Sequence, residues 1–310
     1  MDSIAQNNVL IIVGGPTGIG KTTLGIQLAK HYHADVFSAD SRQLYKELTI
    51  GTAKPAIHEM EKVIHHFIDR ISITEHYNAG IYEKEVLNDL DKYFLTNRIA
   101  IMVGGTGLYI QAVTDGLDKF PEIPDSVIQK ISRDLSNNGI EFLQKNIISK
   151  DPDYAKKVDL QNPHRLIRAL AVIEHTGESY SSFLNKPKEK RSFTPIFVNL
   201  DMDRTELYNR INIRVDQMIE RGLLTEVNQL LTFKNLKSLQ TVGYQELFDF
   251  MEGKYSLEEA VELIKQNSRR YAKRQLTWFR KDKRWQTFHP NNFDGIKQYV
   301  EDEIKGNITE

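Results

Sequence analysis

Residues 9–22 of the chain read VLIIVGGPTGIGKT. The apolar run Val9–Val13 ends at two glycines, which is typical of a buried parallel strand. The next segment, Gly15–Thr22, matches the pattern G-x-x-x-x-G-K-[ST], and residues with helical character follow from Lys21. A strand, a glycine-rich loop and a helix in this order predict a phosphate-binding loop, or P-loop.

The chemistry of such a loop follows from its backbone. Glycines let the chain curve closely around a phosphate, and successive N–H groups and the helix N-terminus point at it. Lys21 adds a mobile positive charge, and the Thr22 hydroxyl can hold Mg²⁺. The predicted diphosphate-binding residues are Gly15, Pro16, Thr17, Gly18, Ile19, Gly20, Lys21 and Thr22. The motif predicts a di- or triphosphate ligand, ATP included, but not the molecule that carries the phosphates.

Alternating strand and helix patterns extend outward from this loop. Ala34–Ser38 and Ile99–Val103 predict two further parallel strands, and Ile81–Leu95 between them predicts an amphipathic helix. Such alternation implies right-handed crossovers. We therefore predict an α/β fold, a P-loop NTPase-like parallel sheet with helices on both faces. Ile196–Leu200 is predicted to resume the sheet, and two long helices, Arg204–Leu231 and Ser256–Trp278, to close the core.

The pattern differs between residues 116 and 194. Helical periods dominate this segment, for example Val127–Leu135 and Arg165–His175, and no clear buried strand is found. Prolines mark its two ends, at positions 121 and 124 and at positions 187 and 195. The sequence therefore predicts a catalytic core made of residues 1–115 and 195–310, with a helical insertion domain at residues 116–194.

The position of the acidic residue is unusual for a P-loop protein. P-loop ATPases and GTPases usually place a carboxylate on a later strand, where it holds Mg²⁺. Here Ile99–Val103 is followed by Gly104-Gly105-Thr106-Gly107, which has no carboxylate. Asp40 instead follows the second predicted strand, whose C-terminal end should face the ligand crevice. We expect Asp40 to lie beside the phosphate loop, although an aspartate at such a site can also cap a turn.

Composition excludes several classes of protein. The chain has 310 residues, a net charge of −1 and no cysteine, so a disulfide framework and a thiol nucleophile are excluded. The polar N-terminus has no basic segment, and Val9–Val13 is too short for a signal sequence or a membrane span. We expect a cytoplasmic protein without a membrane partner. We also expect a monomer, although no motif addresses the oligomeric state.

Positive charge is concentrated near the C-terminus. Lys265–Arg284 contains nine lysines and arginines, one acid, and interleaved aromatic residues such as Tyr271 and Trp278. Cations bind phosphates and aromatic rings stack on unpaired bases, so the segment predicts a nucleic-acid surface that includes Lys273 and Arg274. The alternative is an ordinary amphipathic helix with a solvated basic face.

Several motifs, taken together, resemble the bacterial tRNA dimethylallyltransferases. They are GPTGIGKT at the phosphate loop, SADSRQLYKELTIGTAKP at residues 38–55, GGTGLY at residues 104–109, QNPHR at residues 161–165, VGYQEL at residues 242–247 and AKRQLTWFRK at residues 272–281. Members of this family use the phosphate loop for an isoprenoid diphosphate and have no carboxylate at the usual later strand. The resemblance thus accounts for the missing acid.

The resemblance implies an activity and roles for particular residues. Dimethylallyl diphosphate would donate its prenyl group to the exocyclic amine (N6) of an adenosine adjacent to the anticodon, with Mg²⁺ as cofactor and the tRNA anticodon stem-loop as partner. Asp40 would be the general base. The implied catalytic residues are Asp40, Lys21, Thr22, Arg210, Arg204 and Thr106. The implied tRNA-binding residues are Asp40, Ser41, Arg42, Gln43, Thr106, Gln161, Asn162, Pro163, His164 and Arg165, and the basic segment adds Lys273 and Arg274.

Other interpretations remain open on the residues alone. Arg210, Arg214, Gln217 and Arg221 recur at helical spacing, as on an ordinary solvated helix face. A P-loop small-molecule kinase with the insertion as a lid is one alternative function, and a prenyltransferase acting on free adenine nucleotides is another. A non-catalytic RNA-binding protein is a third. The missing later carboxylate and the basic segment favour prenyl transfer to tRNA.

Overall fold

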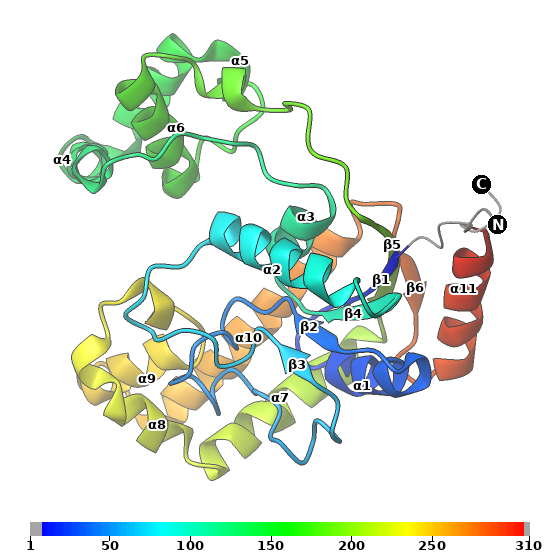
Figure 1. Cartoon of the computed structure of the whole chain (residues 1–310). Helices are drawn as coiled ribbons and strands as arrows, with labels where there is room; N and C mark the ends of the chain where they lie inside the picture. The colour runs from blue at the N-terminus through cyan, green and yellow to red at the C-terminus, as the bar shows by residue number, and fades with distance from the viewer. Residues whose placement is uncertain (1–7, 307–310) are drawn as a thin grey trace. The chain divides into compact units, whose positions relative to one another are not determined.

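The structure, a computed structural model, describes residues 8–306 and divides into two compact units. Residues up to Asp115 and from Arg191 onward form the first, here called the core unit, and Gly116–Lys190 form the second, the insertion unit. The core resumes at Arg191, slightly earlier than position 195, because strand β5 (Phe193–Leu200) already includes residues 193–195. Figure 1 shows the chain from blue to red along its length.

The core unit contains a single sheet and most of the helices. Before the insertion its elements are β1 (Asn8–Gly14), α1 (Lys21–Tyr32), β2 (Val36–Ser38), β3 (His65–His66), α2 (Ala79–Tyr93), β4 (Ile99–Val103) and α3 (Gly107–Thr114). After it come β5, α7 (Arg204–Glu220), α8 (Leu223–Gln229), the 3₁₀ turns η2 (Leu231–Phe233) and η3 (Lys237–Leu239), α9 (Tyr244–Met251), α10 (Leu257–Phe279), β6 (Gln286–Phe288) and α11 (Phe293–Gly306).

The sheet is parallel, and its strand order places the phosphate loop at its centre. Six strands pair in the order β3-β2-β4-β1-β5-β6, and every pairing is parallel. From β1 the chain first builds one side of the sheet with β2, β3 and β4, and then crosses to the other side with β5 and β6. Ligands bind where strand order reverses in such sheets, at the carboxyl ends of the strands. That point is the end of β1, where the segment Gly15–Thr22 begins.

Both faces of the sheet are buried, which explains the continuous apolar runs. In β1, Leu10 and Ile12 belong to one core cluster, while Ile11 and Val13 belong to the other. Helices α2 and α3 cover the first face and α1 and α11 the second (Figure 1). Successive strand residues point to opposite faces, so a strand covered on both sides must be apolar throughout. The predicted fold class is confirmed.

Pro195 lies inside a strand rather than before it. It occupies β5 opposite Leu10 of β1. Proline has no N–H, so it is tolerated where one side of its strand is unpaired. The other neighbour of β5, strand β6, pairs only with Val198–Leu200 and does not reach position 195. The open edge beside Pro195 therefore lets the strand begin at Phe193.

The prediction of one helix over Arg204–Leu231 is wrong. The structure has two helices there, α7 and α8, separated at Gly222. Gly222 has φ 97° and ψ 29°, a left-handed conformation that interrupts an α-helix. The helical spacing of apolar residues continues across the break, because both helices pack on the same core. This spacing alone therefore does not reveal the break. The second long helix is confirmed as α10, with Ser256 as its N-cap.

The insertion unit has its own small core. Its helices are α4 (Asp125–Lys150), α5 (Pro152–Ala155) and α6 (Pro163–Thr176), followed by the 3₁₀ turn η1 (Tyr180–Phe183). Gly139 breaks α4 with φ 76° and ψ 175°. The two halves of α4 pack against α6 through Ile131, Leu143, Ile147 and Leu170. A unit with this separate core depends less on the sheet for its fold.

Asp151 anchors the insertion unit and yields a stability prediction. It is only 2% exposed, and its carboxylate accepts hydrogen bonds from the N–H of Tyr154 (3.0 Å) and the N–H of Ser181 (2.7 Å). Burial acts to raise the pKa of this carboxyl, but the hydrogen bonds from Ser181 and Tyr154 lower it overall. Asp151→Ala would remove the acceptor of these two partly buried N–H groups. We expect it to destabilise the insertion unit by about 1–3 kcal/mol.

Amide hydrogen exchange of α4 and α6 measures this effect directly, because it reports local unfolding. Asp153→Ala is the matched control, since the Asp153 side chain is 76% exposed and forms only a surface pair with Lys156. We expect faster exchange in Asp151→Ala and unchanged exchange in Asp153→Ala. Equal protection in the two variants would contradict the anchoring role. Because the pKa of Asp151 is lowered in the folded protein, its carboxylate contributes to folding stability above the ordinary pKa of 3.8. This contribution is lost as the pH falls below that value.

Candidate active site

The phosphate loop connects β1 to α1 as the sequence predicts. Gly20 is the N-cap of α1 with φ 105° and ψ 18°, a left-handed conformation that other residues adopt at a cost. The Lys21 ammonium donates a hydrogen bond to the carbonyl of Pro16 at 2.8 Å, within the loop itself. Thr22 follows in the first turn of the helix. The backbone therefore has the form needed to bind a phosphate group.

Burial lowers the pKa of Lys21. Desolvation lowers the pKa of its ammonium to about 7, and the nearby Arg214 cation adds to this lowering, while Asp40 opposes it. A free ammonium in water has a pKa near 10.4. The free protein therefore favours the charged form of Lys21 less strongly than water does. A bound polyanion would favour the charged form, so binding of phosphates and protonation of Lys21 are coupled.

Asp40 lies two residues beyond β2, next to the end of β4 and the turn that follows it. The N–H of Ala39 donates to Val103 (2.8 Å), and the N–H of Thr106 donates to Ala39 (3.2 Å). Asp40 Oδ1 accepts hydrogen bonds from the N–H of Arg42 at 2.8 Å and of Gln43 at 3.3 Å. Its Oδ2 has no hydrogen-bond partner within residues 8–306. One carboxylate oxygen thus caps a turn, and the other is available to a ligand.

Arg214 of α7 contacts the phosphate loop. The Arg214 guanidinium donates to Thr17 Oγ1 at 3.4 Å, and burial lowers its pKa while Asp40 opposes the lowering. Arg210 pairs instead with Glu206 at 2.8 Å, and Arg204 is exposed at the start of α7. Lys21, Asp40 and Arg214 therefore form a charged cluster of two cations and one anion.

One feature of the sequence indicates that Arg214 faces the phosphate loop. The buried Ile211 packs against the phosphate loop, 3.0 Å from where a Cβ on Gly18 would lie. Residues three apart share a helix face, so position 214 lies on the same side of α7 as Ile211. The apolar residue thus marks the face that turns toward the loop. Periodicity of the charged residues alone, which groups Arg210, Arg214 and Arg221, does not make this distinction.

Thr106 and Ser41 join the Asp40 turn to the glycine turn after β4. The Thr106 hydroxyl oxygen accepts from the N–H of Ser41 at 3.1 Å and lies 3.3 Å from the Ser41 hydroxyl. From α10, the Tyr271 side chain reaches the same place. Tyr271 is 36% exposed as a residue, but desolvation of its hydroxyl and the Asp40 charge raise its pKa to about 12, with the Arg42 charge and a hydrogen bond to Thr106 opposing. Thr106 and Tyr271 therefore line the surroundings of Asp40.

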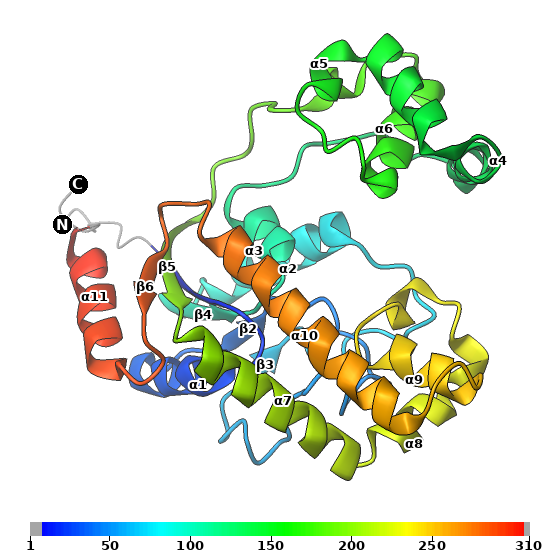
Figure 2. The same ribbon diagram turned by 180° about the vertical axis from the view of Figure 1, so that it is seen from behind.

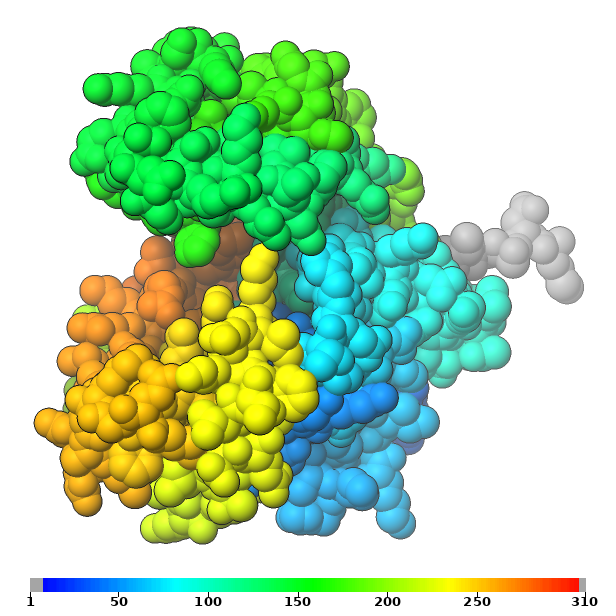
Figure 3. All heavy atoms as spheres, turned by 90° about the vertical axis from the view of Figure 1, so that its left-hand side faces the viewer, coloured from blue at the N-terminus to red at the C-terminus, as the bar shows by residue number. Residues whose placement is uncertain are grey.

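The side chains of Arg42 and Gln43 bind backbone carbonyls of the protein itself. Arg42 donates to the carbonyl of Ser238 at 2.9 Å, and Gln43 donates to those of Thr52 and Ala53. Glu226 of α8 holds the same region through the N–H groups of residues 49–51. Figure 3 shows this α8–α9 region, in yellow, packed against the blue-to-cyan segment that follows Asp40. These contacts fix the loop that carries Asp40.

The motif Gln161–Arg165 forms the start of α6 in the insertion unit. Asn162 caps the helix by accepting from the N–H of Arg165 at 3.2 Å, and Pro163 occupies the first turn. Both residues have the types preferred at these positions. Gln161, His164 and Arg165 are exposed. The motif therefore combines a helix start with three accessible polar side chains.

The basic segment Lys265–Arg284, which covers the second half of α10 and the turn after it, is partly neutralised within the protein. Three of its cations form ion pairs with acids elsewhere in the core unit: Lys265 with Asp216, Arg280 with Asp201 and Arg284 with Asp115. Lys273 and Arg274 are exposed and form no ion pair within residues 8–306. Among the aromatic residues, Phe279 is buried whereas Trp278 is 41% exposed. The accessible basic surface is smaller than the residue count suggests.

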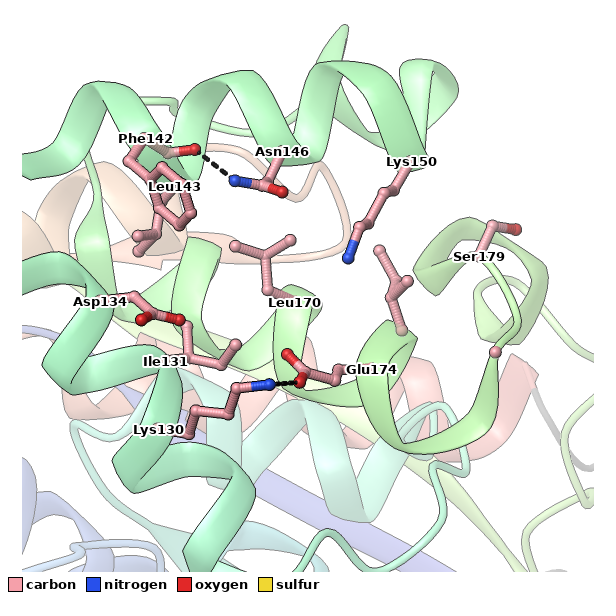
Figure 4. A pocket seen from close by; sticks show the side chains of 12 residues that line it. Lys130, Ile131, Asp134, Phe142, Leu143, Asn146, Lys150, Leu170, Glu174 and Ser179 are labelled. Atoms are coloured by element: carbon pink, nitrogen blue, oxygen red, sulfur yellow. Dashed lines mark hydrogen bonds and ion pairs between the residues drawn. The ribbon is translucent and has the colours of Figure 1, made fainter. Parts of the chain in front are cut away.

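A pocket of about 630 Å³ lies in the insertion unit, between the halves of α4 and α6 (Figure 4). Ile131, Leu143 and Leu170 form its apolar wall, and an ion pair between Lys130 and Glu174 lies at its side. None of the residues predicted for catalysis or binding lines it. The pocket is therefore separate from the charged cluster at the phosphate loop.

Residues 8–306 contain neither a preformed metal cluster nor a membrane-spanning helix. No group of three or more His, Cys, Asp or Glu side chains is arranged to hold a metal ion. None of the helices combines the length and the apolar character that crossing a bilayer requires.

Comparison with known proteins identifies the family. A sequence model of the IPP transferase family matches residues 43–282. The chain belongs to the IPP transferase family. The tRNA dimethylallyltransferase of Christiangramia forsetii is 48% identical over 301 residues, which cover 96% of this chain and 99% of that relative. The enzyme of the same name from Flavobacterium psychrophilum is 49% identical over 280 residues, 88% of this chain and 91% of that one. The resemblance inferred from the motifs is thus confirmed.

Solved structures of IPP transferases have the same fold. The full-length tRNA isopentenylpyrophosphate transferase of Bacillus halodurans is 33% identical, with a TM-score of 0.71 and coverage of 97% of both chains. A eukaryotic dimethylallyltransferase acting on tRNA is 26% identical, with a TM-score of 0.79 over 96% of this chain and 77% of that one. The similarity includes the phosphate loop and the insertion, since nearly the whole chain is covered.

Proposed function

We propose that this chain is a tRNA dimethylallyltransferase. It transfers a dimethylallyl group from dimethylallyl diphosphate to the exocyclic amine of an adenosine adjacent to the anticodon. The observation that carries this proposal is the cluster of Lys21, Asp40 and Arg214 at the end of the central strand. Two cations suit a leaving diphosphate, and the nearby carboxylate suits a proton acceptor.

The reaction forms a C–N bond and breaks a C–O bond. The amine nitrogen attacks the first carbon of the dimethylallyl group, and the diphosphate departs with the electron pair of the broken bond. Its growing negative charge is stabilised by the N–H groups of the phosphate loop, by Lys21 and by Arg214. The amine loses its proton to Oδ2 of Asp40, the oxygen that has no partner in residues 8–306.

Thr22 fits a Mg²⁺ ion that arrives with the diphosphate. Mg²⁺ often has only one or two protein ligands and completes its shell with phosphate oxygens and water. The Thr22 hydroxyl, in the first turn of α1, would be one such ligand, and residues 8–306 contain no carboxylate cluster that would hold the metal alone. Bound Mg²⁺ would neutralise part of the charge on the leaving diphosphate.

Three surfaces are proposed to contact the tRNA anticodon stem-loop. They are the Asp40–Gln43 turn with Thr106, the exposed side chains of α6 at Gln161, His164 and Arg165, and Lys273 with Arg274 on α10. The target adenosine must leave its stack to reach Asp40. Arg204, which is exposed, and Arg210, which is partly exposed and paired with Glu206, are proposed as secondary cations for the diphosphate. We propose a cytoplasmic monomer as the active form.

Incubation with labelled dimethylallyl diphosphate, Mg²⁺ and unmodified tRNA tests the function. We expect the label to appear on the exocyclic amine of one adenosine next to the anticodon. Transfer to free AMP in place of tRNA would indicate a prenyltransferase of free nucleotides. Consumption of ATP with a small acceptor and no transfer to tRNA would indicate a kinase, and either result would contradict the proposal.

The α10 surface gives a salt-dependence prediction. Lys273→Ala/Arg274→Ala removes two exposed cations, and each lost phosphate contact should flatten the slope of log affinity against log salt by about 0.7–0.9. We expect the double variant to bind tRNA more weakly with a shallower slope, and to bind inorganic pyrophosphate as the wild type does. Filter binding at several salt concentrations measures both quantities.

Lys84→Ala/Lys92→Ala is the matched control for this variant. It removes the same number of exposed positive charges from α2 of the same unit, so the change in net charge is equal. We expect its slope to match that of the wild type. Equal flattening in both double variants would show that net charge, and not the α10 surface, determines tRNA binding.

A further inference from the structure

Gln275 of α10 bonds to two separate loops at once. It is 6% exposed and lies in the same helix as the exposed Lys273 and Arg274. Its Oε1 accepts a hydrogen bond from the N–H of Thr17 in the phosphate loop at 2.9 Å. Its Nε2 donates to the carbonyl of Gly105, in the turn after β4, also at 2.9 Å. The amide therefore spans two of the loops that surround the charged cluster.

The chemistry of the site suits a primary amide specifically. One loop offers a buried donor and the other a buried acceptor, and a glutamine side chain presents an acceptor and a donor in a single plane. A glutamate would have to be protonated to serve both. Position 105 has no room for a side chain, because a Cβ on Gly105 would lie 2.2 Å from Gln275 Nε2. The Gly105 backbone therefore approaches the amide as closely as packing allows.

The same helix faces the region around Asp40. Tyr271, one turn before Gln275, interacts with Thr106 and is affected by the Asp40 charge. Thr17 is held from two sides, by Gln275 of α10 and by Arg214 of α7, and Figure 2 shows these two helices side by side. Any shift of α10 must therefore move or break the contacts that fix Thr17 and Gly105.

We propose that Gln275 is a positioning residue that links tRNA binding on α10 to diphosphate binding in the phosphate loop. This inference rests on the proposed function, in which Lys273 and Arg274 contact tRNA. A ligand that fixes α10 holds the Gln275 amide in place and so holds the Thr17 N–H and the loop around it. The loop is then ordered before the diphosphate arrives, and less freedom is lost on binding. Binding energies are reciprocal, so diphosphate should also tighten tRNA binding by the same factor.

The test measures the affinity for inorganic pyrophosphate with Mg²⁺, in the presence and absence of saturating tRNA. The ratio of the two affinities is the coupling factor, and coupled sites typically show about 5-fold or more. Gln275→Met keeps a similar length and removes both hydrogen bonds. Gln275→Glu keeps the acceptor for Thr17 and loses the donor to Gly105. Gln266→Met, at an exposed position of the same helix, is the matched control.

We expect a coupling factor of about 5-fold or more in the wild type and in Gln266→Met, a factor near 1 in Gln275→Met and an intermediate factor in Gln275→Glu. Affinity for tRNA alone should be unchanged in all of them. In the Gln275 variants the single-turnover rate should fall, and the KM for tRNA at saturating dimethylallyl diphosphate should rise, because the diphosphate no longer tightens tRNA binding. A coupling factor near 1 in the wild type, or wild-type coupling in a folded Gln275→Met or Gln275→Glu protein, would overturn the inference.

These results are distinguishable from failure of the function itself. If the wild type does not bind or prenylate tRNA, the proposed function is wrong, whatever the variants do. If the wild type prenylates tRNA and the Gln275 variants retain its coupling factor, only the positioning role is wrong. Thermal melts of each variant identify loss of folding, and Gln275→Glu remains informative if Gln275→Met does not fold.

Discussion

Asp40→Asn is expected to slow prenyl transfer by about 10²–10⁴-fold, the usual loss when a general base is removed. Asparagine retains Oδ1, which can continue to accept hydrogen bonds from the N–H groups of Arg42 and Gln43. The substitution replaces Oδ2 with an amide nitrogen that cannot accept a proton. The turn is thus preserved and the base is lost. A single-turnover assay at saturating tRNA measures the effect.

Binding and stability separate this result from a structural defect. The Asp40 carboxylate lies near Lys21 and Arg214, and it repels an incoming diphosphate, so the Asn variant should bind pyrophosphate at least as tightly as the wild type. Asp40→Ala is the control, because it loses the turn cap as well and should cost about 1 kcal/mol of stability. A folded, saturated Asp40→Asn enzyme with wild-type chemistry would rule out the general-base role.

The phosphate loop and the central strands could be predicted from sequence because their signals are local. Val9–Val13 is apolar throughout since both sheet faces are covered, and Gly20 must adopt a left-handed conformation at the start of α1. Local chemistry of this kind is visible in a dozen consecutive residues. The same reasoning fails for β3 and β6, which have two and three residues and owe their existence to neighbouring strands.

The composition of the charged cluster could not be predicted in full, because it depends on which face of α7 meets the loop. Sequence analysis selected Arg204 and Arg210 by resemblance, and Arg214 reaches Thr17 in the structure. The choice between positions one turn apart is made by the packing of Ile211 against Gly18. Helical spacing relates the arginines to one another but not to a distant loop.

The strength of the basic surface on α10 likewise depends on distant residues. Lys265 and Arg280 are neutralised by Asp216 and Asp201, which precede them by tens of positions and belong to or border α7. The Arg42 guanidinium is also occupied within the protein, because it donates hydrogen bonds to the carbonyls of Lys237, Ser238 and Gln240. A count of cations in a segment predicts a surface only after pairing in the fold is known. Lys273 and Arg274 remain accessible, and they carry the salt prediction.

Lys21→Met is expected to lower the single-turnover rate by about 10²–10³-fold, the usual loss when one electrostatic contact to a developing charge is removed. Methionine keeps much of the unbranched, apolar character of the lysine stem and removes the ammonium. Because the diphosphate gains charge as the C–O bond breaks, the loss should appear in the chemical step at saturating substrate. The measurement is a single-turnover time course with labelled dimethylallyl diphosphate and excess enzyme and tRNA.

Lys21→Met should reduce the rate without reducing the stability of the folded protein at neutral pH. Desolvation lowers the pKa of Lys21 from 10.5 to about 7 in the folded protein, so the unfolded chain binds more protons between these values. Wild-type stability should therefore rise as pH increases through this window, and the Met variant should lack that rise. At pH 7 and below, the variant is expected to melt no earlier than the wild type, because it avoids burying a charge. An early melt, or a wild-type rate in the folded variant, would remove Lys21 from the leaving-group site.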